Sequence, residues 1–300
     1  MNMDEERQQK LTFNIVIPLY KKPDIVDKFS IKRLFDVIDT KYDVYFMFDT
    51  NYKYFDELKS WLSDEFNLTF NKDYYINAIE GNWFESKQTY SQLLLSDWFY
   101  KEWLALGYEY TYIYQTDCYL FSDKLQYFVE LGYDYIGAPI LATNSDWGLT
   151  GGYVGNGGFS LRNNRKFMDI LWRDSYLWQT HGEEFENKTL SKNNNYRYID
   201  FEDIFICKLL SKYTKISIPS CKVAAEFAYD RNPYECSLFY NVKVPMCAHN
   251  FILQSLYWKD YITELESNKE LKCVCDKTLT DWDNMKHPEL EGEQGMNMCW

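Results

Sequence analysis

The sequence predicts an α/β fold in which a mostly parallel central sheet carries helices on both faces. Through the first half of the chain, short apolar runs alternate with segments whose apolar residues recur at helical spacing. Strands and helices in this rhythm are typical of parallel sheets that are covered on both faces. The length of 300 residues and the absence of internal repeats favour one main domain.

The individual elements are expected in the following order. The first half contains strands at 13–19 (FNIVIPL), 42–48 (YDVYFMF) and 110–114 (YTYIY), with helices at 31–38, 55–66 and about 90–103. The second half is less regular, with strand-like residues at 133–136 and 153–161 and helices near 167–171 and at 200–210. The polar, asparagine-rich residues 183–195 are typical of a mobile surface loop.

The two ends of the chain differ from its middle. Residues 1–12 are expected to form an N-terminal extension, 13–263 the main domain and 264–300 a polar C-terminal tail. The first ten residues are rich in charged side chains and contain no apolar stretch of signal-peptide length. No apolar run approaches the roughly 18 residues that a membrane span needs. The eight cysteines are scattered singly. Together these features predict a cytoplasmic protein with free thiols and no membrane span.

Charge and composition limit the partners. The chain has 32 basic and 45 acidic residues, which gives a formal net charge of −13. That balance disfavours binding nucleic acid through its phosphates and docking on anionic membranes, because both need a basic surface. Aromatic residues make up 19% of the chain. They serve equally well in core packing, in interfaces and in stacking against sugar rings, so their number does not distinguish these roles.

Candidate binding residues follow three of the predicted strands. In open parallel sheets, ligands bind in the crevice beyond the carboxyl ends of the strands. The residues at those ends are Pro18, Leu19 and Tyr20 after the first strand, Asp49 after the second, and Gln115, Thr116 and Asp117 after the third. An aspartate there can hold a hard divalent cation, or it can cap a helix or turn. Position alone leaves both interpretations open.

Three further segments carry candidate chemistry. Three glycines and an asparagine interrupt the strand pattern of residues 153–162 (YVGNGGFSLR). Such an interruption indicates either a close approach of the backbone to a ligand or a bulge. The candidates in that segment are Gly155, Asn156, Gly157 and Gly158. Glu202 and Asp203 begin an apolar helix, where a carboxylate can act as a general base or merely favour the helix dipole. His249 follows a strand-like segment and is either a metal ligand or a hydrogen-bonded structural residue.

Taken together and in order, these segments resemble a family of glycosyltransferases that was long known as a domain of unknown function. The stretches that carry the resemblance are VIPLYKKP, YIYQTDCYLF, LGYDYIGAP, YVGNGGFSLR, FEDIF and MCAH, within residues 13–261. The family is similar to the glycosyltransferase-A (GT-A) superfamily, whose fold is a single Rossmann-like α/β nucleotide-binding domain. The tail from residue 264 lies outside the resemblance.

The resemblance implies a role for each candidate. The strand ends, Tyr90 and the glycine segment would bind a nucleotide-sugar donor. An Asp-x-Asp motif in the superfamily binds a divalent cation, Mn²⁺ or Mg²⁺, together with the sugar diphosphate. Gln115-Thr116-Asp117 stands in that place, so Asp117 alone keeps a carboxylate and metal dependence stays open. His249 matches a late histidine of the metal or diphosphate site. Asp203, with Glu202 beside it, resembles the acid that activates the acceptor.

The leading hypothesis is therefore a nucleotide-sugar-dependent, hexosyltransferase-like enzyme of glycan biosynthesis. It would move a sugar to a hydroxyl of a glycan, a glycolipid or another acceptor. A base at Asp203 predicts single displacement with inversion, whereas a retaining enzyme would not need that base. Two alternatives stay open. One is a non-catalytic carbohydrate-binding or scaffold protein on a transferase-like fold, and the other is a sugar transferase that acts on modified viral DNA.

Overall fold

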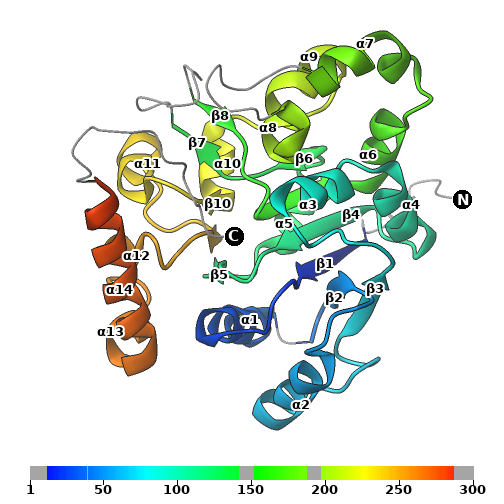
Figure 1. Cartoon of the computed structure of the whole chain (residues 1–300). Helices are drawn as coiled ribbons and strands as arrows, with labels where there is room; N and C mark the ends of the chain where they lie inside the picture. Colours follow the sequence, from blue (N-terminus) through cyan, green and yellow to red (C-terminus); the bar gives the residue numbers. More distant parts are fainter. Residues whose placement is uncertain (1–11, 39, 142–151, 188–196, 287–300) are drawn as a thin grey trace, which may run out of the picture.

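A six-stranded sheet forms the centre of the molecule (Figure 1). The computed structural model describes residues 12–38, 40–141, 152–187 and 197–286, so the predicted N-terminal extension lies outside the described residues except for Thr12. The strand order is β3-β2-β1-β4-β9-β6. Its strands are β1 (Phe13–Pro18), β2 (Asp43–Asp49), β3 (Tyr75–Ile79), β4 (Tyr110–Tyr114), β6 (Tyr135–Ile136) and β9 (Phe159–Asn163). Strands β1 to β4 are mutually parallel, whereas β9 is antiparallel to β4 and β6.

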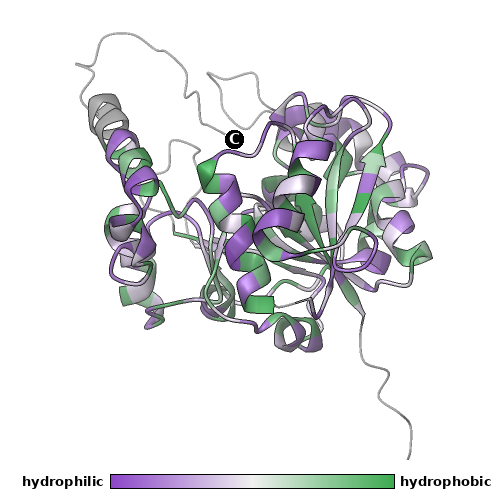
Figure 2. Ribbon diagram, turned by 90° about the horizontal axis from the view of Figure 1, so that it is seen from below, coloured by the Kyte–Doolittle hydropathy of each residue, from purple (hydrophilic) through white to green (hydrophobic). Residues whose placement is uncertain are grey.

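Side chains on the central strands alternate between two cores. On β1, Ile15 and Ile17 belong to one core and Val16 to the other; on β4, Tyr112 and Ile113 divide in the same way. Helices α1 (Ile25–Ile38), α2 (Phe55–Phe66) and α5 (Leu125–Glu130) complete the first core. Helices α3 (Lys87–Leu94), α4 (Asp97–Ala105) and α6 (Asn164–Leu171) complete the second. The predicted α/β class, with a mostly parallel sheet covered on both faces, is confirmed, and Figure 2 shows the hydrophobic strands between the helices.

The second half of the chain adds short elements around this centre. The helices are α7 (Tyr176–Asn187), η1 (Tyr198–Asp200), α8 (Glu202–Ile204), η2 (Phe205–Leu210), α9 (Ser211–Tyr213), α10 (Cys221–Phe227), α11 (Pro233–Tyr240), α12 (Ser255–Trp258), α13 (Glu264–Ser267) and α14 (Lys269–Lys286). Strands β7 (Pro139–Ile140) and β8 (Tyr153–Val154) form a two-stranded sheet. A third sheet has the order β10-β11-β5, with β5 (Tyr119–Leu120), β10 (Ala228–Tyr229) and β11 (Cys247–Ala248).

Several predicted elements need correction. The single helix expected at 90–103 is two helices, because Ser96 adopts an extended backbone before α4 and its hydroxyl donates to Leu93 O at the end of α3. The expected strand at 153–161 is β8 and the start of β9, which belong to different sheets. Residues 183–187 are helical rather than a loop, since Phe185 is buried in the second core; residues 188–195 lie outside the described part. The helix expected at 200–210 begins at Glu202 and widens to a π-helix over η2.

The C-terminal residues that the structure describes pack against the domain. Leu265, Leu271 and Cys275 on α13 and α14 are buried in a third core with Trp258. The segment predicted as a polar tail therefore contributes helices up to Lys286, while the boundary at residue 264 stays a prediction. The seven cysteines in the described residues are free thiols. No described helix has both the length and the apolar character needed to cross a bilayer.

Candidate active site

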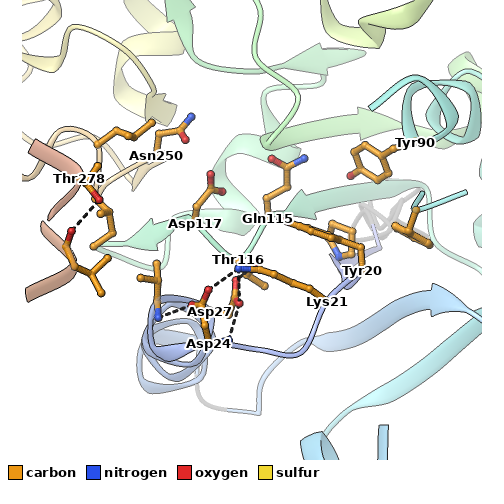
Figure 3. Close-up of a pocket in the computed structure, with 16 residues that line it drawn as sticks. Tyr20, Lys21, Asp24, Asp27, Tyr90, Gln115, Thr116, Asp117, Asn250 and Thr278 are labelled. Atoms are coloured by element: carbon orange, nitrogen blue, oxygen red, sulfur yellow. Dashed lines mark hydrogen bonds and ion pairs between the residues drawn. The ribbon is translucent and has the colours of Figure 1, made fainter. Parts of the chain in front are cut away.

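A pocket of about 340 Å³ opens at the carboxyl ends of β1 and β4 (Figure 3). These neighbouring strands form the point where the strand order reverses, because β2 and β3 lie on one side of β1 and β4 lies on the other. The helix that follows β1 covers one face of the sheet, and the helices that precede β4 cover the opposite face. A crevice at such a reversal is the usual ligand site of open α/β sheets.

Three polar side chains meet at the floor of this pocket, where Gln115 and Asp117 line it and His249 lies directly behind them. His249 Nε2 lies 3.2 Å from Asp117 Oδ1 and 3.1 Å from Gln115 Oε1. Its other ring nitrogen, Nδ1, lies 3.0 Å from Asp230 Oδ1. Asn250 also donates a hydrogen bond of 2.7 Å to that Asp230 oxygen. The histidine is thus held from behind by Asp230 and directed at Asp117 and Gln115.

The small third sheet explains why these residues meet. β5 begins two residues after Asp117, and it pairs antiparallel with β11, which ends one residue before His249. β10 pairs in parallel with β11 and ends one residue before Asp230. The His249 backbone N–H donates to Tyr229 O at 2.8 Å, which continues the ladder to the histidine itself. Two-residue strands therefore place three polar groups from distant parts of the chain within contact.

The charge on His249 depends on its two carboxylate neighbours. Burial alone would lower the pKa of the imidazole, but Asp117 and Asp230 outweigh burial and raise that pKa well above its ordinary value. Asp230 shows the reciprocal effect: burial would raise the pKa of its carboxyl, but the hydrogen bond to His249 dominates and lowers it. Without a cation, the imidazole therefore carries a proton on each nitrogen and bridges two carboxylates.

The same donor set fits a divalent cation. One ligand atom each from Asp117, Cys118 and His249 lies within 4.8 Å of the others. The Cys118 thiol is fully buried and donates to Gly158 O at 3.6 Å, which leaves the Asp117 carboxylate at the pocket and the His249 imidazole behind it as the candidate ligands. Asp230 would hold Nδ1–H and turn the Nε2 lone pair toward a metal, which is the usual carboxylate–histidine–metal arrangement.

A second charged cluster lines the pocket beside β1. Asp24 caps α1 by accepting from the Val26 and Asp27 backbone N–H groups at 2.8 and 3.1 Å, and Asp27 accepts the Asp24 N–H in return. Lys21 forms ion pairs with both aspartates. Because two carboxylates already satisfy this helix N-terminus, α1 does not offer the anion site that free helix ends provide.

The glycine segment packs directly beneath the floor of the pocket. Gly158 O accepts the Gln115 N–H at 2.9 Å, which extends the β4–β9 pairing to the end of the pocket. A Cβ atom on Gly158 would lie 2.0 Å from His249 Nε2, and one on Gly157 would lie 2.0 Å from Glu202 Oε1. Both positions therefore require glycine because side chains approach the backbone closely. Asn156 adopts the left-handed conformation and accepts the Gly158 N–H at 3.2 Å.

The predicted acidic pair divides into two environments. Glu202 is buried and receives a 2.9 Å ion pair from the fully buried Arg162, whose guanidinium also donates to Tyr100 and Ser160. Asp203 accepts the Gly157 N–H at 3.2 Å. Burial, followed by repulsion from Glu202, raises the pKa of Asp203 to about 7. Asp203 therefore has the protonation equilibrium of a general base, whereas Glu202 is the counterion of a buried arginine.

Part of this chain matches a known protein family. Residues 73–249, more than half of the chain, match a family model described as "Protein of unknown function (DUF5672)". The chain belongs to the DUF5672 family. No curated protein matches the chain.

Two solved structures are similar to this DUF5672 protein. One is a glycosyltransferase involved in the glycosylation of the major capsid of PBCV-1, with 10% identity, a TM-score of 0.43, and coverage of 79% of this chain and 93% of that chain. The other is the galactosyltransferase LgtC in complex with donor and acceptor sugar analogs, with 10% identity, a TM-score of 0.48, and coverage of 79% and 86%.

The predicted site residues of the DUF5672 chain lie in three places. Pro18, Tyr20, Tyr90, Gln115, Thr116 and Asp117 line the pocket itself. Leu19 and Asp49 line an adjoining cavity of about 410 Å³ that also contains Tyr20, and Asp49 there accepts the Trp83 and Phe84 N–H groups at 3.0 and 3.2 Å. Gly155 to Gly158, Glu202, Asp203 and His249 lie outside the lining of both cavities, although Gly158 contacts His249 and Gln115.

Sequence reasoning missed several residues of this site. Asp230 directly follows an apolar pair of residues, which is the same strand-end signal that identified Asp117. Asp24 and Asp27 have the three-residue spacing of a helix capping box, so their place at the start of α1 was detectable. Arg162 carries no local signal, because its partner Glu202 is 40 residues away.

Proposed function

We propose that this DUF5672 protein is a nucleotide-sugar-dependent glycosyltransferase that uses a divalent cation. The observation that carries the proposal is the Asp117–His249–Asp230 arrangement at the floor of a pocket where the strand order reverses. Such a crevice suits a nucleotide, and a carboxylate with an imidazole suits the cation that accompanies a diphosphate. The likeness in sequence motifs to GT-A enzymes agrees with this assignment.

The two adjoining cavities fit the parts of a nucleotide sugar. The adjoining cavity lies over the ends of β1 and β2 and contains the rings of Tyr20, Tyr52, Tyr54 and Phe84, which suit a flat nucleobase. It shares Tyr20 and Phe84 with the pocket that holds Asp117, so one ligand can extend through both. The nucleoside would occupy the adjoining cavity, and the diphosphate would reach Lys21 and the Asp117–His249 floor.

The residues then take separate roles. Asp117 and His249 would hold Mn²⁺ or Mg²⁺, which supplies charge neutralisation for the diphosphate leaving group. Asp230 orients the imidazole through Nδ1. The cation would take the place of the hydrogen that Nε2 shares with Gln115 in its absence. Asp203 is our candidate for the base that removes the proton of the acceptor hydroxyl, because its pKa of about 7 allows it to exchange protons near neutral pH. A base in that role favours inversion.

Release of nucleoside diphosphate tests the proposal. UDP- and GDP-sugars, which release a nucleoside diphosphate, and CMP-sugars, which release CMP, are screened with hydroxyl acceptors in the presence of Mn²⁺, Mg²⁺ or EDTA. We expect turnover with at least one donor, and a loss of more than about 100-fold in Asp203→Asn, which is the usual range for an acid–base group. Asp117→Asn removes a carboxylate ligand of the cation and should also lower turnover. Asp64→Asn, an exposed residue of α2, is the control. Glycan binding without any nucleotide binding would instead support the carbohydrate-binding alternative and refute the enzyme.

A further inference from the structure

The pocket has an aliphatic side that a nucleotide sugar does not explain. In Figure 3, Tyr20, Lys21 and Tyr90 lie on one side of Asp117 and Gln115, whereas Asn250 and Thr278 lie on the other. Thr278 follows Val274 by one turn, and Val274 and Val26 pack against the third core, which contains Ile252. We call the five lining residues Val26, Ile252, Leu253, Val274 and Thr278 the apolar wall. Apart from Val26 on α1, the apolar wall comes from residues after 249, and none of it lies in the segment 73–249 that matches the family model.

Helix α14 supplies the apolar wall through one of its two apolar stripes. Leu271 and Cys275 are one turn apart and buried in the third core, so they fix the helix to the domain. Val274 and Thr278, also one turn apart, line the pocket. The Thr278 hydroxyl donates to Val274 O at 2.8 Å, so its hydrogen is already used within the helix. The stripe that borders the pocket therefore offers mainly aliphatic contact.

The loop after His249 brings the rest of the apolar wall to the cation-binding residues. The Phe251 N–H points to Asp117 O at 3.4 Å, and Phe251 is fully buried in the third core. The two residues that follow are Ile252, which is 8% exposed, and Leu253, which is 41% exposed. A group that lies on the apolar wall is therefore adjacent to Asp117 and His249, where the transferred sugar would be.

The chemistry of the apolar wall distinguishes between possible occupants. A nucleobase is recognised by stacking on aromatic rings and by hydrogen bonds to its edges. The five residues of the apolar wall include no aromatic ring, and the one hydroxyl among them is already used. The aromatic residues of the pocket are Tyr20, Phe84 and Tyr90, and Figure 3 shows Tyr20 and Tyr90 across Asp117 from Thr278. Tyr20 and Phe84 also line the adjoining cavity. The donor sugar is polar throughout, so the apolar wall fits the remaining reactant, the acceptor.

We propose that the apolar wall binds the alkyl or aryl group of an amphipathic acceptor, whose hydroxyl-bearing part extends to the polar floor of the pocket. This inference rests on the proposed transferase function and narrows its acceptor to a glycoside or alcohol with an apolar group next to the reacting portion. The acceptor class is then set by residues outside the family-matched segment.

Binding of two glucosides that differ in their apolar group tests the apolar wall without any turnover. Submicellar n-octyl β-D-glucoside and methyl β-D-glucoside are titrated calorimetrically and by NMR of isoleucine, leucine and valine methyl groups. We expect the octyl compound to bind at least about tenfold more tightly, since burial of two methylene groups already gives that factor. We also expect it to shift the methyl signals of Ile252, Leu253 and Val274.

Two matched variants of α14 distinguish binding at the apolar wall from nonspecific hydrophobic binding elsewhere on the protein. Val274→Asp places a charge in the pocket, whereas Cys273→Asp places the same charge on the exposed face of α14. We expect Val274→Asp to weaken octyl glucoside binding at least about tenfold and Cys273→Asp to leave it unchanged. Leu253→Asp provides a second variant on the half-exposed rim, should Val274→Asp unfold.

Several results would overturn this proposal. Equal affinity for the two glucosides, no binding of the octyl compound, or equal binding by the two aspartate variants of α14 would each do so. A shift of the Val274 methyl signal by UDP or GDP alone would assign the apolar wall to the nucleobase instead. Release of nucleoside diphosphate is measured separately, so loss of the transferase proposal is distinguishable: turnover can be absent while the octyl group binds, or present while it does not.

Discussion

Replacing Gly158 by alanine tests whether the glycine segment sets the position of the candidate cation ligand. The new Cβ would lie 2.0 Å from His249 Nε2, 2.5 Å from its Cδ2 and 2.6 Å from Gln115 Oε1. Ordinary contacts between such atoms are about 3.5 Å, so the imidazole must move by roughly 1.5 Å. The 3.0 Å contact between His249 Nδ1 and Asp230 does not survive a movement of that size.

The expected loss in the free energy of unfolding is the sum of two contributions. Overpacking in a buried site costs about 1–3 kcal/mol, and a lost hydrogen bond to a charged group costs about 1.5–3 kcal/mol. A total near 3–5 kcal/mol corresponds to a fall in Tm of roughly 10 °C for a chain of this size. Because the imidazole no longer faces Asp117, we also expect Mn²⁺ affinity to fall about 10–100-fold, the usual effect of losing a partner that orients a metal ligand.

The assay combines thermal unfolding with Mn²⁺ titration. Gly152→Ala is the matched control, since its Cβ would meet nothing closer than 3.6 Å. We expect the Tm and the Mn²⁺ affinity of this control to match the unmodified chain. If Gly158→Ala keeps its Tm within about 1 °C, a change of well under 1 kcal/mol, and binds Mn²⁺ normally, then the glycine segment does not position His249.

Three more predictions concern the acidic pair and a helix. Activity should rise with pH through about 7, because a base acts only when deprotonated, and burial together with repulsion from Glu202 raises the pKa of Asp203 to that value. Glu202→Gln removes the repulsion and should move this rise in activity to lower pH. A pH–rate profile that does not move would contradict the coupling between the two carboxylates. Arg162→Met should lower the free energy of unfolding by about 3–5 kcal/mol, because it leaves the buried Glu202 carboxylate without its partner. Arg162→Met combined with Glu202→Met should recover most of that loss in urea unfolding, and equal losses in both would refute the ion-pair explanation. Gly182→Ala in α7 should stabilise the chain by about 0.5–1 kcal/mol in the same assay, since its Cβ meets Trp178 only at 3.8 Å; a loss of stability would show that this space is not available.

The main sheet could be predicted because its strands carry their own pattern. β1 and β4 are buried, mostly apolar strands, and the residues at their carboxyl ends, Pro18, Tyr20, Gln115 and Asp117, line the pocket. At Gly158 the His249 and Gln115 side chains approach the backbone closely, whereas the approach of the glycine segment to a ligand stays a prediction. These features depend on local periodicity and on a general rule for strand ends, which one sequence displays.

The rest of the site depends on pairings that a local pattern does not display. β5, β10 and β11 have two residues each, too few for any periodicity, and yet their register places Asp230 behind His249. The apolar wall could not be predicted from the sequence for a related reason. Val274 and Thr278 stand in an otherwise polar segment, so their stripe becomes visible only when Leu271 and Cys275 fix the orientation of α14.

The third sheet also has a consequence for the order of folding. β1 to β4 are complete by residue 114 and can pair while synthesis continues, since folding proceeds from the N-terminus. β10 and β11, however, lie more than 100 residues after β5, so closing this sheet spans a long loop and is expected to be slow. The nascent chain would thus acquire its scaffold well before Asp117 gains its histidine. Until the last third emerges from the ribosome, the central strands would be paired without a competent centre.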